Sequence, residues 1–90
     1  MDTNQAEIVK ALRKIGCSVQ SLASVGNGCP DLLVGYHGDN YLLEVKREDG
    51  PPSGKRLTDL EAEWQERWVG SCAVVDSPEA AIRYVLASGR

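Results

Sequence analysis

Two carboxylates and one amine lie at a spacing that suits metal-assisted hydrolysis of a phosphodiester. Asp31 ends the run Gly28-Cys29-Pro30-Asp31, and Glu44-Val45-Lys46 begins thirteen residues later. A carboxylate pair can hold a hard divalent cation such as Mg²⁺ or Mn²⁺, and a backbone carbonyl can add a ligand. Such a cation activates water and polarises phosphate, while a nearby lysine can orient the water or neutralise developing charge. We therefore expect Asp31, Glu44 and Lys46 to be catalytic, with the Val45 carbonyl as a further metal ligand.

This expectation requires the two segments to be neighbouring strands of a hairpin. Residues 31–36 and 41–46 are rich in leucine, valine and tyrosine and are joined through residues 37–40. Side chains alternate along a strand, so Glu44 and Lys46 share a face. A loop of even length centred on Gly38-Asp39 pairs positions that sum to 77, with Asp31 opposite Lys46 and Glu44 diagonal to it. An odd loop without a bulge would put Asp31 on the wrong face.

The elements before the hairpin are predicted from periodicity and turn residues. Apolar residues at helical spacing predict a helix over 3–15, with Asp2, Thr3 or Asn4 as its cap and Gly16 beyond its end. Asn4 followed by Glu7 resembles a capping box. A weaker strand over 17–24 and a turn over 26–28 follow. Glu7 lies on a helix that must pack near the hairpin, so it could complete the site directly or through water; a plain capping role is the alternative.

The elements after the hairpin include an irregular loop, a helix, a strand and a last helix. Two prolines and two glycines exclude regular structure over 48–56. Thr58 and Glu61 form a Thr-x-x-Glu capping box for a helix over 59–69, whose apolar stripe is Leu60, Trp64 and Trp68. The two tryptophans suit a core or dimer interface better than a base-stacking platform. A buried strand over 73–75 and a helix opened by Ser77-Pro78 complete the chain.

Composition limits the class of protein. The chain has 90 residues, a net charge of -3, and 26% charged and 42% hydrophobic residues, which predicts one globular domain over 1–90. An acidic balance argues against a protein that coats nucleic acid nonspecifically, but not against a metal-dependent nuclease. Three cysteines without paired spacing predict free thiols in a reducing cytoplasm. No signal peptide or membrane span is expected.

The order of these elements predicts an α/β fold with a small mixed β-sheet flanked by helices. Basic residues border the expected site on both sides of the irregular loop. Arg47, Lys55 and Arg56 could contact DNA phosphates or could form a solubilising surface.

Taken together, the motifs resemble the PD-(D/E)XK nuclease superfamily. Within it, the chain resembles the viral replication and repair nuclease (VRR-NUC) domain in its short stand-alone phage and bacterial form. The resemblance rests on Glu7, Gly28-Cys29-Pro30-Asp31-Leu32, Glu44-Val45-Lys46, the loop ending in Lys55-Arg56-Leu57-Thr58, the aromatic-bearing helix, and Val74-Val75-Asp76-Ser77-Pro78-Glu79-Ala80. It covers nearly the whole chain.

The resemblance implies a restriction-endonuclease-like core, dependence on Mg²⁺ or Mn²⁺, and a homodimer. It implies DNA as substrate, with branched structures such as Holliday junctions as candidates in repair or recombination. The family usually carries a glutamine three residues before the aromatic of the helix that follows the loop. Here that position is Glu61, and Gln65 lies one turn later on the same helical side. Either could serve, or the role could be missing.

Two functions of different classes follow. The first is a metal-dependent, structure-selective DNA endonuclease that acts as a dimer and cuts two strands. The second is a non-catalytic DNA- or protein-binding module that retains the nuclease fold, which the acidic balance and the altered helix position favour.

Overall fold

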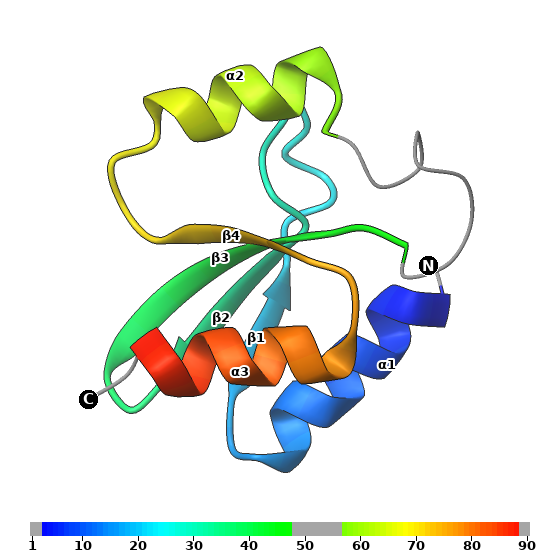
Figure 1. The fold of residues 1–90 in the computed structure, drawn as a ribbon, viewed down its shortest axis with the longest axis vertical. Helices are drawn as coiled ribbons and strands as arrows, with labels where there is room; N and C mark the ends of the chain where they lie inside the picture. The colour runs from blue at the N-terminus through cyan, green and yellow to red at the C-terminus, as the bar shows by residue number, and fades with distance from the viewer. Residues whose placement is uncertain (1–2, 48–56, 89–90) are drawn as a thin grey trace.

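A computed structural model describes residues 3–47 and 57–88 of the chain, which form a mixed sheet with helices on both sides (Figure 1). The elements are α1 Thr3–Lys14, β1 Ser18–Ser21, β2 Leu32–Tyr36, β3 Asp39–Val45, α2 Asp59–Arg67, β4 Cys72–Val75 and α3 Pro78–Ser88. The strands lie in the order β1-β2-β3-β4; the first three are antiparallel, and β4 runs parallel to β3. This architecture confirms the predicted α/β fold. The loop predicted over 48–56, with Lys55 and Arg56, lies outside the described residues.

The β2–β3 hairpin has an even register, as the site requires, but its centre is not where the sequence analysis placed it. Tyr36 pairs with Asp39, and Leu32 pairs with Leu43, so paired positions sum to 75 and not 77. His37 and Gly38 form the turn with φ values of 49° and 85°. Positive φ at both central positions is the signature of a type I′ turn, whose twist matches that of the flanking strands. The predicted centre at Gly38-Asp39 is therefore wrong by one residue, while the predicted parity is right.

The core lies between one face of the sheet and the two helices α1 and α3 (Figure 1). Alternation along β2 and β3 directs Leu32, Val34 and Leu43 toward that layer, where each is fully or almost fully buried. Ile8 of α1 and Val85 of α3 meet them. These helices fix the sheet from one side only, so the opposite face, called the outer face below, is free to carry function.

Helix α1 begins at its predicted residue, Thr3, and ends at Lys14, one residue before its predicted end. Gly16, with φ of 100°, follows the last turn as expected of a glycine at a helix C-terminus. Asn4 lies inside the helix, so the predicted Asn4–Glu7 capping box is wrong. The Asn4 side-chain Nδ2 donates to the backbone carbonyls of Lys46 at 2.7 Å and Asp76 at 3.0 Å. Asn4 thus ties α1 to the ends of β3 and β4.

We expect Asn4→Ala to lower the free energy of unfolding by about 2 kcal/mol, because two carbonyls lose a half-buried donor. Urea denaturation measures this change. Lys10→Ala, an exposed substitution on the same helix, is the matched control and should change stability by less than about 0.5 kcal/mol. Equal stability of the two variants would contradict this role of Asn4.

Helix α2 lies on the outer-face side of the sheet, opposite to α1 and α3 (Figure 1), and buries no residue completely. It ends at Arg67, two residues before the predicted end, because Trp68 is extended with φ of -80° and ψ of 121°. Leu60 is 57% exposed and Trp68 is 47% exposed, and the Trp68 ring stacks on that of Trp64. The core role considered for this stripe is therefore wrong. Val74 of β4, predicted to be buried, is 43% exposed.

Candidate active site

Asp31 and Glu44 meet on the outer face, where α2 approaches the sheet. Continuing the β2–β3 register by one position sets Asp31 opposite Glu44, and Lys46 becomes the diagonal neighbour. The predicted pairing of Asp31 with Lys46 is wrong for this reason, and the observed register brings the two carboxylates closer together. Asp31 Oδ2 accepts a hydrogen bond from the Val45 N–H at 2.7 Å, and the Asp31 carbonyl accepts one from Leu22 at 2.8 Å. Both bonds fix Asp31 just before β2 begins.

Pro30 leaves the Val45 carbonyl available on the same side. Continued two positions beyond the Leu32–Leu43 pair, the register would set Pro30 opposite Val45, at a position where an antiparallel pair exchanges both ladder hydrogen bonds. Proline has no N–H, so it cannot donate to the Val45 carbonyl. The Val45 N–H is taken by the Asp31 side chain. The run Pro30-Asp31 therefore holds one carboxylate at the strand end and spares one carbonyl oxygen beside it.

Glu44 is a buried acid with an orphaned oxygen. Glu44 is only 2% exposed. Within the described parts of the chain, no donor forms a hydrogen bond with its Oε1. Burial, together with hydrogen bonding to and repulsion from the carboxyls of Asp31 and Glu61, raises the pKa of Glu44 to about 9. Without a cation, Glu44 is therefore protonated at neutral pH. A cation between Asp31 and Glu44 would relieve both the burial cost and the repulsion.

Lys46 faces these acids from the same side of β3. Its Nζ lies 2.7 Å from Glu61 Oε1 and 3.6 Å from Glu44 Oε2. Burial alone lowers the pKa of Lys46, but the carboxylates of Glu61, Glu44 and Asp31 outweigh it and raise that pKa. The ammonium is therefore charged and held in place.

Glu61 reaches the site from α2 while it caps that helix. Its Oε1 accepts from the Thr58 N–H at 2.8 Å, and Thr58 Oγ1 accepts from the Glu61 N–H at 3.2 Å, so the predicted capping box is confirmed. Burial tends to raise the pKa of Glu61, but its bonds to Lys46 and Thr58 lower that pKa overall. One carboxylate thus fixes both the helix start and the lysine.

Gly28 seats the start of α2 over the site, a role that the sequence analysis missed. A Cβ at this position would collide with the Leu60 carbonyl, and the φ of Gly28 is 84°. Only glycine combines this close approach with this backbone conformation. The sequence feature that indicates this role is Gly28, the second glycine of Gly26-Asn27-Gly28. These three residues were interpreted only as a turn.

The remaining predicted residues are less closely tied to the site. Gln65 shares the Glu61 side of α2, and its Nε2 is buried without a hydrogen-bond partner among the residues described. Glu7 is exposed on α1, and nowhere in residues 3–47 and 57–88 does it pair with Asp31, Glu44 or Lys46. Arg47 is exposed directly after Lys46. No three histidine, cysteine, aspartate or glutamate side chains in those ranges form a ready metal-binding group.

A solved structure shares the fold that carries this site. One structure, described as a VRR_NUC domain, superposes with a TM-score of 0.69 at 24% sequence identity, over 94% of this chain and 92% of that chain. The chain has the fold of a VRR_NUC domain. No protein-family model matches the sequence, and a search of curated proteins finds no significant match. The VRR_NUC fold here puts Asp31, Glu44 and Lys46 together on the outer face. None of the helices that the structure describes is long and apolar enough to cross a membrane.

Proposed function

We propose that the chain is a metal-dependent endodeoxyribonuclease that hydrolyses phosphodiester bonds of DNA. The nuclease-type fold makes this class the first candidate. The observation that carries the proposal is the buried Glu44, whose Oε1 is unpartnered in the described structure, opposite Asp31 and beside the charged Lys46. An ionised Glu44 buried beside Asp31 would be costly on its own, so this pair of carboxyls points to a cation that compensates their charge.

The donor set fits a hard divalent cation. The Asp31 and Glu44 carboxylates and the Val45 carbonyl would hold Mg²⁺ or Mn²⁺, and water and DNA phosphate would complete its shell, as is usual for Mg²⁺. When bound, the ion would supply an activated water and a polarised phosphate. Two carboxylates suffice for such a site, so it is compatible with the described residues, among which no three histidine, cysteine, aspartate or glutamate side chains are placed to hold a metal ion.

The chain's own residues would then divide the work. Glu44 must release its proton before it can act as a ligand. Lys46, held by Glu61, would neutralise charge on the phosphate or orient the attacking water. Gln65 offers a buried amide donor on the same side of α2, and Glu7 could reach the cation through water.

A homodimer would supply two such sites for two strands. Leu60, Trp68, Val69 and Val74 are exposed apolar residues of α2, of the segment that follows it and of β4; we call them the α2–β4 apolar surface. A 90-residue domain gains stability by covering such a patch with a second copy. Two sites in one symmetric dimer suit branched DNA such as a Holliday junction, and hence a role in repair or recombination.

We expect Val69→Asp to shift the protein from dimer to monomer, because Val69 is fully exposed and a buried unpaired charge would oppose association. Light scattering at micromolar concentration measures the mass. Val25→Asp, at a 57% exposed valine between β1 and β2, is the matched control and should stay dimeric. A parent protein that is already monomeric would contradict the dimer.

The cleavage test compares a four-way junction, a linear duplex and supercoiled plasmid with Mg²⁺, with Mn²⁺ and with chelator. The proposal requires cleavage with either metal and none with chelator, with the junction preferred. Failure to cut any of the three substrates with either metal would contradict it.

A second candidate is a non-catalytic DNA- or protein-binding module. It is favoured by the Lys46–Glu61 ion pair, which engages the lysine with an acid at the position where the VRR-NUC family usually has glutamine. Calorimetric titration separates the candidates: DNA binding with a steep salt dependence but no heat from Mg²⁺ or Mn²⁺ would favour this module.

A further inference from the structure

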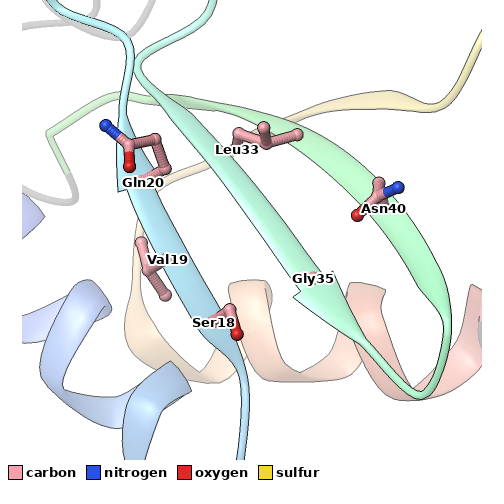
Figure 2. Close-up of a pocket in the computed structure, with 6 residues that line it drawn as sticks. All are labelled: Ser18, Val19, Gln20, Leu33, Gly35 and Asn40. Atoms are coloured by element: carbon pink, nitrogen blue, oxygen red, sulfur yellow. The ribbon is translucent and has the colours of Figure 1, made fainter.

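The outer face of the sheet is hollowed over β1, β2 and the start of β3, away from Glu44. Figure 2 shows the hollow, with α1 and α3 behind the sheet. It has a volume of about 200 Å³ and is lined by Ser18, Val19, Gln20, Leu33, Gly35 and Asn40. Pockets that enclose small molecules usually exceed about 300 Å³. A shallow hollow of this size suits one edge of an extended polymer better.

Gly35 forms the floor of the hollow. It pairs with Ser18 on one side and with Asn40 on the other, so two polar side chains flank a position without a side chain. A Cβ at Gly35 would lie 3.5 Å from Asn40 Oδ1 and 3.7 Å from Ser18 Cβ, which is ordinary contact. A side chain at position 35 would therefore enter the hollow without a backbone clash. Ser18, Gln20 and Asn40 bring hydroxyl and amide donors to the rim of the hollow.

One stretch of this acidic chain that includes β1, at the edge of the hollow, is cationic. Residues 8–30 contain Lys10, Arg13 and Lys14 and no acid, a net charge of +3 in a chain of net charge -3. Arg13 Nη2 donates to the Val19 carbonyl at 3.2 Å, and this contact is exposed. β1 is an edge strand, so the guanidinium lies beside the hollow at the border of the sheet.

The hollow lies on the same face of the sheet as the candidate active site. Asn40 and Glu44 lie on the same face of β3, four residues apart, which is about 13 Å along a strand. B-form DNA advances about 3.4 Å per base pair, so this distance corresponds to about four base pairs. A duplex arm that leaves the site along β3 would pass over Asn40, Gly35 and Arg13.

We propose, on the basis of the nuclease function above, that Arg13, Ser18, Gln20, Gly35 and Asn40 form a surface that binds the sugar–phosphate backbone of this DNA arm. Arg13 supplies charge, and Ser18, Gln20 and Asn40 supply hydrogen bonds. Gly35 lets the backbone approach the sheet. Contacts of this kind position DNA without reading its sequence.

Fluorescence anisotropy with a labelled four-way junction in chelator tests the surface by binding alone. Gly35→Val fills the hollow and should weaken binding about tenfold, while Asn40→Ala should weaken it about fivefold through lost hydrogen bonds. Arg13→Gln should reduce the slope of log K against log salt by about one, and Asn40→Ala should leave that slope unchanged. Arg83→Gln, an exposed arginine of α3 behind the sheet, is the control and should leave affinity and slope unchanged.

The outcomes separate this surface from the nuclease function. If the parent cuts DNA but the Arg13, Gly35 and Asn40 variants bind as the parent does, the inference is overturned and the nuclease function stands. If Gly35→Val turns a dimer into a monomer, the hollow is an interface between copies, which also overturns it. If the parent binds no junction in chelator at low salt, the surface proposal is overturned, and the cleavage test alone decides the nuclease function. Because valine is favoured in β-strands, Gly35→Val is compatible with the fold of β2. Arg13→Gln and Asn40→Ala test the surface independently of that variant.

Discussion

Asp31→Asn is expected to lower the rate of metal-dependent DNA cleavage about a thousandfold. Asparagine can still accept the hydrogen bond from the Val45 N–H, so the strand end should keep its shape. The substitution removes one of the two anionic oxygen ligands of the metal. A loss of about 4 kcal/mol in transition-state stabilisation corresponds to a thousandfold lower rate. Single-turnover cleavage of a junction with Mg²⁺ measures the rate.

Two further variants make this result specific. Lys46→Met should lower the rate about a hundredfold or more, because the site loses the cation that offsets phosphate charge. Asp39→Asn removes an exposed carboxylate at the hairpin turn and should leave the rate unchanged. Cleavage by Asp31→Asn within tenfold of the parent would show that the site is elsewhere.

Glu44 should make the metal-free protein less stable as pH rises. Its pKa is about 9 in the folded chain against 4.5 as an ordinary glutamate. Below pH 4.5 both states are protonated, so the stability is fully present. Between pH 4.5 and 9 the unfolded chain releases the proton while the folded chain retains it, so stability falls by up to about 1.4 kcal/mol per pH unit. Above pH 9 the loss is complete.

Urea denaturation of the parent and Glu44→Gln between pH 5 and 8.5 measures this slope. Glu44→Gln should remove most of it. The lowered pKa of Glu61 acts in the opposite sense, since its stabilisation is lost only as pH falls below about 4.5, outside this range. Parallel curves for the two proteins would contradict the buried, protonated Glu44.

The same proton links metal binding to pH. A ligand carboxylate must be ionised, so Mg²⁺ affinity should rise about tenfold per pH unit between pH 6 and 8, with one proton released per ion bound. Saturating Mg²⁺ should also flatten the pH dependence of parent stability. Both effects follow from the site that the sequence indicated, but their size depends on a burial that only the fold reveals.

Local rules predicted the parts of the structure that depend on neighbouring residues. The Thr58–Glu61 capping box and the glycine after α1 follow from sequence spacing of one helical turn or less. The hairpin parity was also predictable, because only an even loop keeps Asp31 on the face of Glu44. The centre of the hairpin turn could not be predicted. Asparagine or aspartate is expected at the first position of a type I′ turn, and here that position is His37.

Contacts between distant segments could not be predicted. Lys46 and Glu61 are fifteen residues apart and meet only because Gly28 admits the start of α2 close to the loop. Asn4 pairs with carbonyls at both strand ends, which no local pattern indicates. The apolar stripe ending at Trp68 predicted an amphipathic helix correctly, yet amphipathicity does not say whether the apolar side meets a core or another chain.

A crystal structure of the protein with Mn²⁺ would show which residues bind the ion, because anomalous scattering marks its position. The account predicts one peak bound by the carboxylates of Asp31 and Glu44 and the carbonyl of Val45, at about the 2.1 Å typical of a small hard cation. It also predicts that the peak disappears in Asp31→Asn. An ion bound by other residues, or no peak at millimolar Mn²⁺, would contradict the account.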